Sequence, residues 1–278
     1  MIIDGKSLSQ KIREGLKLDV EALKKQGKKV GLAVILVGDD SASQVYVRNK
    51  INACAELGIE SFSYRYPSDI DEITIMDKVT ELNLRDDVSG ILCQLPLPKH
   101  LDEKKILANI SSKKDVDGFC AEQVGLLSLG TPDLVSCTPQ GIIELIKSTG
   151  VSIVGKNAVV IGRSNIVGKP MFNLLLQESA TVTICHSKTQ NLQEVCSRAD
   201  ILVAAIGKAK FVTSDFVKQG AVVIDVGMNR DENGKLCGDV DFENVKEKCG
   251  FITPVPGGVG PMTITMLMKN TIKSASRN

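Results

Sequence analysis

Hydrophobic residues along this chain follow two alternating patterns. Short continuous apolar runs are typical of strands buried on both faces of a parallel sheet. Between them, apolar residues recur every three or four positions, as on one face of a helix. We expect strands at 33–37, 62–66, 90–95, 158–161, 181–185, 201–206 and 221–226, and helices at 12–23, 41–57, 73–84, 103–110, 141–148, 171–177, 192–197 and 262–274. The alternation predicts an α/β fold of two three-layer domains, the second a Rossmann-type parallel sheet.

The expected domain boundary lies near 138–140, where the second series of strands and helices begins. Residues 1–138 would form the first domain and 139–261 the second, while the pattern alone lets the final segment, 262–278, pack on either. Ser7 or Ser9 is expected to cap the first helix, and Ser41 to open a capping box at the second.

Composition narrows the function classes. Thirty-four basic and 33 acidic residues give a net charge of +1, which argues against nucleic-acid or membrane-surface binding. No apolar run reaches the roughly 18 residues of a membrane span, and the first ten residues lack a signal-peptide core, so a cytoplasmic location is expected. The eight cysteines form no C-x-x-C and are interpreted as buried apolar residues. Two histidines offer little for a triad or zinc site, and no metal is expected.

A glycine turn follows the strand expected at 158–161. Glycine allows a tight turn and a close approach of backbone N–H groups to a pyrophosphate at a helix start. The spacing departs from G-x-G-x-x-G, because Ser164 replaces the second glycine and the last glycine comes one residue late; an ordinary strand-to-helix turn remains an alternative. The candidate cofactor-binding residues here are Gly162, Arg163, Ser164, Ile166, Val167 and Gly168.

The next strand indicates which dinucleotide is bound. NAD sites place an acidic residue about 20 residues onward to bind the ribose hydroxyls. Here the strand ends in Ser187 and Lys188 without a carboxylate, and Arg163 lies in the turn. These residues favour the 2′-phosphate of NADP, although Lys188 equally fits a solvated surface lysine.

Three polar features of the first domain are candidates for chemistry. Tyr46 and Lys50 lie four residues apart and share a helix face; a lysine of lowered pKa can transfer protons. Gln94 ends an apolar strand, where α/β sheets bind ligands. Asp115 and Asp117 flank a valine, and a carboxylate matches adjacent N–H donors of an aminopyrimidinone. Each feature also has an alternative interpretation. Tyr46 and Lys50 would be a surface pair, and Gln94 would be a loop residue. Asp115 and Asp117 would form a turn or hold a divalent metal ion.

Taken together, these motifs resemble one family, the bifunctional methylenetetrahydrofolate dehydrogenase/methenyltetrahydrofolate cyclohydrolases. The resemblance covers essentially the whole chain, and the order of the motifs is more specific than any one of them. The matching segments are Tyr46-x-x-x-Lys50, Gln94-Leu-Pro-Leu-Pro98, Lys114-Asp-Val-Asp-Gly118, Gly162 to Gly168, and Pro256-Gly-Gly-Val-Gly-Pro-Met-Thr263.

The resemblance implies a folate-binding first domain completed by the last helix, an NADP-binding second domain, an active site in the cleft between them, and a homodimer. Lys50 would be the general acid/base of the hydrolysis, assisted by Gln94. Tyr46 would stack on the aminobenzoate ring, and Asp117 would anchor the pterin. The folate pocket would be lined by Pro256, Gly257, Gly258, Val259 and Gly260.

The activity implied by the resemblance is oxidation of 5,10-methylenetetrahydrofolate with NADP, followed by hydrolysis of the methenyl product to 10-formyltetrahydrofolate. Three alternatives remain. A monofunctional dehydrogenase would lack the hydrolysis, a different two-domain NADP oxidoreductase would act on a small acid, and a binding protein would not turn over. Assays with folate substrates separate them.

Overall fold

The computed structural model describes residues 1–277, and the chain forms two compact units. Unit 1 comprises Met1–Gln10 and Thr138–Thr263; unit 2 comprises Lys11–Cys137 and the residues from Ile264 onward. The sequence pattern did not anticipate that the first ten residues belong with unit 1. They do so because Ile3 N donates to Ile252 O at 2.8 Å and Ile252 N donates to Met1 O at 3.0 Å, which adds a short extended segment beside the sheet of unit 1.

Unit 2 contains a parallel three-stranded sheet in the order β2-β1-β3. All seven residues of β1 are buried, so this strand is the centre of the unit. The strands are β1 (Gly31–Val37), β2 (Glu60–Tyr66) and β3 (Gly90–Cys93). The helices are α2 (Ser41–Leu57), α3 (Glu72–Leu84), α4 (Glu103–Ala108) and α5 (Ala121–Ser128), with most of α1 (Gly5–Lys25) and α10 (Val259–Ala275).

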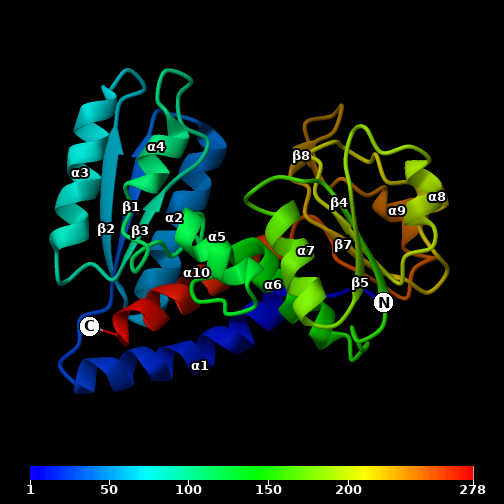
Figure 1. The fold of residues 1–278 in the computed structure, drawn as a ribbon, viewed down its shortest axis with the longest axis horizontal. Helices are drawn as coiled ribbons and strands as arrows, with labels where there is room; N and C mark the ends of the chain where they lie inside the picture. Colours follow the sequence, from blue (N-terminus) through cyan, green and yellow to red (C-terminus); the bar gives the residue numbers. More distant parts are fainter. Residues whose placement is uncertain (278) are drawn as a thin grey trace. The chain divides into compact units, whose positions relative to one another are not determined.

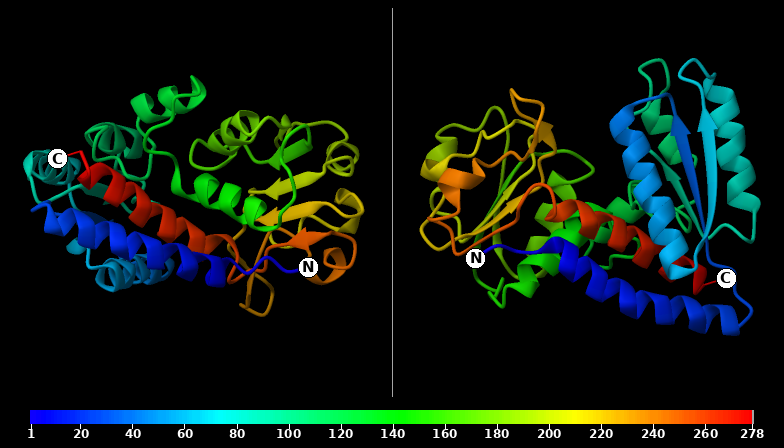
Figure 2. Two further views of the ribbon diagram at one scale, coloured as in Figure 1. Left: turned by 90° about the horizontal axis from the view of Figure 1, so that it is seen from below. Right: turned by 180° about the vertical axis from the view of Figure 1, so that it is seen from behind.

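The helices of unit 2 cover both faces of its sheet. Ala33, Ile35 and Val37 of β1 pack in one core cluster with residues of α3 and α4, and the alternate residues of the strand face α2. Figure 1 shows α2 and α3 on opposite sides of the strands. The unit-2 parts of α1 and α10 run side by side in both views of Figure 2, and Arg13 Nε donates to Thr265 Oγ1 at 3.0 Å between them.

Unit 1 contains a parallel five-stranded sheet in the order β10-β7-β6-β4-β5. Helix α7 packs on β4 and β5, and a buried apolar cluster under α8 fills the space against β6 and β7. The strands are β4 (Asn157–Ile161), β5 (Thr181–Cys185), β6 (Ile201–Ala204), β7 (Val222–Asp225) and β10 (Phe251–Ile252), with a separate antiparallel pair, β8 (Asn229–Arg230) and β9 (Leu236–Cys237). The helices are α6 (Cys137–Ser148), which belongs to unit 1 except for its first residue, α7 (Gly168–Gln177), α8 (Leu192–Cys196), the 3-10 turn Ser214–Phe216, and α9 (Phe242–Val245).

The predicted α/β class with parallel sheets is confirmed, whereas the predicted helix caps are wrong. The Asp4 carboxylate accepts bonds from Ser7 N and Ser7 Oγ, so α1 begins before either predicted serine. Asp40, not Ser41, caps α2 by accepting from Ser43 N at 2.7 Å. Asp4 and Asp40 each lie directly before the first helical residue, where a side-chain oxygen can accept from the free N–H groups of the first turn. No helix within residues 1–277 is long and apolar enough to cross a bilayer.

Candidate active site

Lys50 and Gln94 meet at the centre of unit 2. Lys50 comes from α2, is 8% exposed, and donates from Nζ to Gln94 Oε1 at 2.9 Å. Gln94 follows β3 directly, and its own Nε2 donates to Leu95 O, which fixes the amide oxygen toward the lysine. Burial lowers the pKa of Lys50 from its ordinary value, and the negative charge of Asp117 opposes that shift. An amine whose pKa is lowered by burial gives up its proton more readily than a solvated lysine does.

The two aspartates of the 115–117 segment have different surroundings. Asp115 is buried and accepts from Gly118 N at 3.1 Å and Cys120 N at 2.6 Å, so the turn reading is correct for this residue. Asp117 interacts with Lys50 instead. Burial raises the pKa of Asp117 to about 6, while the Lys50 charge limits the rise. The carboxylate that the resemblance singled out is therefore the one that interacts electrostatically with the lysine.

Cys137 is a fourth member of the site, which the sequence pattern indicated only as a buried apolar residue. It is the first residue of α6, its Sγ lies 3.2 Å from Val116 O, and its thiol hydrogen bonds with the Asp117 carboxylate. Burial raises the pKa of Cys137 well above its usual range, so it is a neutral thiol. We call Lys50, Gln94, Asp117 and Cys137 the acid/base cluster. The helix was expected only from residue 141, but Pro139 suits a first helical turn and is the sequence signal that indicates the earlier start at Cys137.

Tyr46 lies one turn before Lys50 on the same face of α2. Its side chain is half-buried, and burial raises the pKa of its hydroxyl, which keeps the phenol neutral. A neutral, partly exposed ring offers a surface for stacking. Within residues 1–277, no group of three histidine, cysteine or acidic side chains is arranged to hold a metal ion.

The raised pKa of Asp117 gives a pH-dependent prediction for stability. Its carboxyl ionises near pH 4 in the unfolded chain but near pH 6 in the folded one, so its folding contribution is lost as the pH rises through that interval. Asp117→Asn does not titrate. We expect its free energy of unfolding, relative to wild type, to increase by up to about 3 kcal/mol between pH 4 and pH 7.

Urea denaturation followed by circular dichroism at several pH values measures this difference. Asp69→Asn, at an exposed carboxyl of the same unit, is the matched control and should run parallel to wild type. Parallel curves for Asp117→Asn as well would refute the buried, raised-pKa assignment.

The glycine turn after β4 is tightly packed in unit 1. Gly162 has φ +128°, and an added Cβ would lie 2.2 Å from Ala205 O at the end of β6. Gly162 N also donates to Cys185 O at the end of β5. A Cβ on Gly168 would lie 2.1 Å from Gly162 O, so the late glycine lets α7 approach the turn. Close helix–strand packing is the role of the third glycine in a dinucleotide turn, which explains the unusual spacing.

Ser164 has a specific local function. Its Oγ accepts from Val167 N at 3.2 Å and Gly168 N at 3.3 Å, so the serine caps the start of α7. Ile166 lies between them on the exposed side of the turn. The serine that replaces the second glycine therefore organises the helix terminus that would face a pyrophosphate.

Arg163 and Ser187 follow neighbouring strands. Strands β4 and β5 pair in register with Ile161 opposite Cys185, so both residues stand at the carboxyl edge of the sheet, and both are exposed. The turn that carries Ser187 is closed by His186 N donating to Thr189 Oγ1 at 2.9 Å and Lys188 N donating to His186 Nδ1 at 3.1 Å. A cation and a hydroxyl at adjacent strand ends suit a phosphate monoester.

Asp239, which the sequence pattern did not single out, supports the loop after β6. It is fully buried and accepts bonds from the backbone N–H groups of Ile206, Gly207 and Lys208 and from Asn229 Nδ2. The loop lies at the same sheet edge as the glycine turn. Asp239 belongs to an isolated Asp-Val-Asp sequence without helical or strand periodicity. The hydrophobic pattern therefore gave no reason to single out this residue.

The 256–260 loop belongs to unit 1, whereas the acid/base cluster belongs to unit 2. Gly257 has φ +105°, and its carbonyl accepts from Lys6 N at 3.1 Å. A Cβ on Gly5 would lie 1.9 Å from Gly258 O, so the loop backbone packs directly on the start of α1. The close approach of the backbone at Gly258 is therefore explained by its packing against α1, independently of any bound ligand.

The five-stranded parallel sheet with a glycine turn after β4 defines unit 1 as a Rossmann-type dinucleotide-binding unit. Two family models place the chain more closely. Residues 3–117 match the tetrahydrofolate dehydrogenase/cyclohydrolase catalytic domain, and residues 136–278 match the tetrahydrofolate dehydrogenase/cyclohydrolase NAD(P)-binding domain. The chain belongs to the tetrahydrofolate dehydrogenase/cyclohydrolase family, which confirms the resemblance drawn from its motifs.

Individual relatives agree with the family models. The chain is 60% identical over 277 residues to the bifunctional protein FolD of Lachnoclostridium phytofermentans, covering 100% of this chain and 98% of the relative. The crystal structure of the Campylobacter jejuni FolD methylenetetrahydrofolate dehydrogenase/cyclohydrolase superposes with a TM-score of 0.97 at 50% identity, covering 100% and 99% of the two chains. The Trypanosoma brucei enzyme, in complex with NADP and an inhibitor, gives 0.95 at 38% identity, covering 100% and 97%.

Proposed function

We propose that this protein oxidises 5,10-methylenetetrahydrofolate with NADP and hydrolyses the resulting methenyl compound to 10-formyltetrahydrofolate. The observation that supports the hydrolytic activity is the buried Lys50 amine in a chain of this family. The amine lies 2.9 Å from Gln94 Oε1 and interacts electrostatically with Asp117. A monofunctional dehydrogenase would have no need of a buried lysine held by an amide.

The acid/base cluster supplies proton transfer for the hydrolysis. Water adds to the methenyl carbon, and the adduct must lose a proton and protonate a ring nitrogen before the ring opens. Lys50 Nζ, with its pKa lowered by burial, takes the first proton and returns it. Gln94 holds the amine in place, and we propose that Asp117 anchors the pterin edge and Tyr46 stacks on the aminobenzoate ring.

The residues of unit 1 fit a dinucleotide. The pyrophosphate would be held by the glycine turn and the α7 terminus that Ser164 caps, where Gly162 and Gly168 leave no room for a side chain. Arg163 and Ser187 would hold the 2′-phosphate. When bound, NADP accepts a hydride from the methylene carbon, which needs positioning more than a strong base. We propose that the 256–260 loop contributes the backbone side of the folate pocket.

An absorbance assay tests this function. Methylenetetrahydrofolate is supplied with NADP⁺ and, separately, with NAD⁺, and the decay of methenyltetrahydrofolate is followed without cofactor. We expect NADP⁺ reduction and accelerated methenyl decay. Turnover of neither folate would refute the proposed substrate, and preference for NAD⁺ would refute the assignment of Arg163 and Ser187.

Arg163→Ala gives a sharper test of cofactor choice. Loss of a charge-assisted bond to the 2′-phosphate should raise KM for NADP⁺ roughly 10- to 100-fold and leave KM for NAD⁺ unchanged. Ser187→Ala should act in the same direction with a smaller effect. Arg198→Ala, which removes an exposed arginine paired with Glu194 in the same unit, is the control. An equal effect on both cofactors would show that Arg163 does not read the phosphate.

Domain roles, assembly and location complete the proposal. We assign folate binding and proton transfer to unit 2 and cofactor binding to unit 1, with a homodimer as the assembly that the family resemblance implies. Sedimentation equilibrium tests the dimer. The eight free thiols, most of them buried, support a reducing cytoplasmic compartment, which cell fractionation tests.

A further inference from the structure

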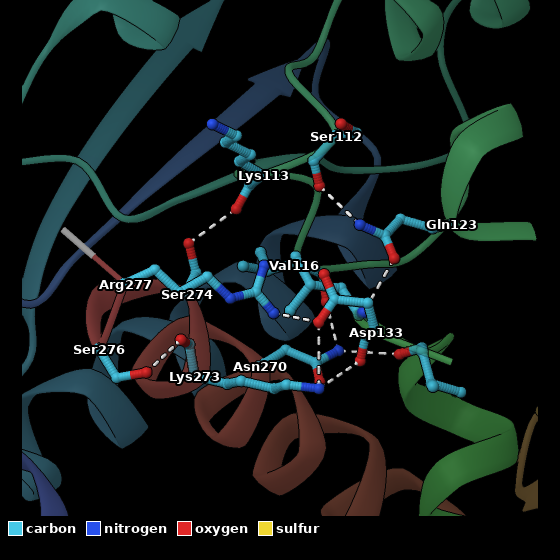
Figure 3. A network of polar contacts seen from close by, with 12 residues as sticks. Ser112, Lys113, Val116, Gln123, Asp133, Asn270, Lys273, Ser274, Ser276 and Arg277 are labelled. Atoms are coloured by element: carbon cyan, nitrogen blue, oxygen red, sulfur yellow. Dashed lines mark hydrogen bonds and ion pairs between the residues drawn. The ribbon is translucent and has the colours of Figure 1, made fainter. Parts of the chain in front are cut away.

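Asn270 on α10 joins two loops of unit 2 that carry members of the acid/base cluster. Its side chain is 1% exposed, and its Nδ2 donates to Val116 O and to Val135 O, each at 2.8 Å. Val116 directly precedes Asp117, and Val135 lies two residues before Cys137. Figure 3 shows the amide of Asn270 turned toward Val116. Both hydrogens of one amide therefore hold two loops together.

The amide also reaches the cluster itself. Asn270 Nδ2 lies 3.6 Å from Cys137 Sγ, and that thiol lies 3.2 Å from Val116 O. Asn270, Val116 and Cys137 thus contact one another pairwise, and the Cys137 thiol in turn hydrogen bonds with the Asp117 carboxylate. None of the roles in the proposed function uses Asn270.

A second buried amide spans the same two loops farther from the cluster. Gln123 of α5 is 2% exposed, donates from Nε2 to Ser112 O at 2.8 Å, and accepts from Leu134 N at 2.9 Å. Figure 3 places it on the far side of these loops from Asn270. Gln123 makes the same kind of bridge without contacting a group beside Lys50, so it separates a purely structural role from a positioning role.

We propose that Asn270 is a positioning residue of the hydrolytic step, which fixes the Asp117 carboxylate and the Cys137 thiol relative to the Lys50 amine. The inference rests on the proposed function, because that function gives Lys50 the proton transfer. The interaction between two charges falls with their separation, so a displacement of the Asp117 carboxylate changes the proton affinity of the lysine.

The direction of the change follows from the groups around Lys50. Asp117 and Cys137 are the groups that act electrostatically on the amine, and Gln94 is neutral. Asp115 raises the pKa of Asp117, and Asp117 in turn raises the pKa of Cys93. Asp117 is the anion that opposes the effect of burial on Lys50. Releasing the Asp117 loop therefore lowers the pKa of Lys50 further. The limb of the pH–rate profile that reports this lysine then shifts to lower pH.

The test compares Asn270→Leu, which keeps the volume without donors, and Asn270→Ser, which keeps one donor, with Gln123→Leu as the control. kcat and KM for methenyl hydrolysis are measured from about pH 6 to about pH 9. We expect Asn270→Leu to lose about tenfold in kcat, with a smaller change in KM and a limb shifted to lower pH. Asn270→Ser should be intermediate, and Gln123→Leu should be less stable but keep the wild-type profile.

Two results would overturn the inference: an unchanged pH profile in both Asn270 variants, or an equal shift in Gln123→Leu. Asn270→Ser gives the decision if Asn270→Leu does not fold. Failure of the proposed function looks different, because wild type would then fail to hydrolyse methenyltetrahydrofolate, or Lys50→Met would still hydrolyse it, and this inference would fall with it.

Discussion

Lys50→Met should lower methenyl hydrolysis by about 10²- to 10⁴-fold, the range of a lost general acid/base, while reducing dehydrogenase activity far less. Methionine preserves the length and apolar stem of a side chain that is 8% exposed, so packing on α2 is retained. The substitution removes the proton-transferring amine and leaves Gln94 Oε1 without its donor. Hydride transfer depends on positioning, so it should survive in part.

The two activities are measured on the same preparation by NADP⁺ reduction and by methenyl decay. Lys17→Met, at an exposed lysine of α1, is the control and should match wild type in both assays. Equal losses of both activities in Lys50→Met would assign the lysine to substrate binding rather than to proton transfer.

Periodicity predicted the main elements well where burial is complete. β1 is buried at every position and includes the predicted residues 33–37, because a continuous apolar run leaves few alternatives to a central parallel strand. β5 also occupies the predicted residues 181–185, although it is a partly exposed strand at the edge of its sheet. The cofactor turn was likewise predictable, since a glycine between a buried strand and a helix is a local signal. Helix starts were less predictable: Asp4 and Asp40 cap α1 and α2, because the acceptor that wins depends on backbone geometry, not on residue type alone.

Long-range contacts account for what the sequence could not predict. Cys137 and Asn270 are 133 residues apart, and nothing in the spacing indicates that their side chains meet. The pairing of Met1–Ile3 with Ile252 is equally non-local. The aspartates at 115 and 117 could not be told apart by pattern, because turn formation and ligand binding favour the same residue. Only the donors around each carboxylate separate their roles.

Gly162→Ala should produce the opposite separation of activities, with dehydrogenase lost and hydrolysis largely retained. At φ +128° a side chain is strained, at a cost of about 1–3 kcal/mol, and its Cβ would lie 2.2 Å from the backbone oxygen Ala205 O. The turn must therefore move away from β6 and no longer fit a pyrophosphate. We expect NADP⁺ affinity to fall by at least about 100-fold, which corresponds to roughly 3 kcal/mol.

Gly155→Ala is the control that has the backbone strain of a positive φ without the steric clash, so comparing it with Gly162→Ala isolates the effect of the clash. Gly155 also has a positive φ, +71°, but an added Cβ meets nothing within 4 Å. It should destabilise the protein by about 1–2 kcal/mol without changing NADP⁺ binding. Calorimetric titration of NADP⁺ and thermal denaturation compare the two variants. Equal NADP⁺ affinities in the two variants would mean that the turn tolerates a side chain. A loss of NADP⁺ binding in Gly162→Ala alone would place the cofactor in unit 1. Together with the opposite loss of hydrolysis in Lys50→Met, it would place the proton transfer in unit 2.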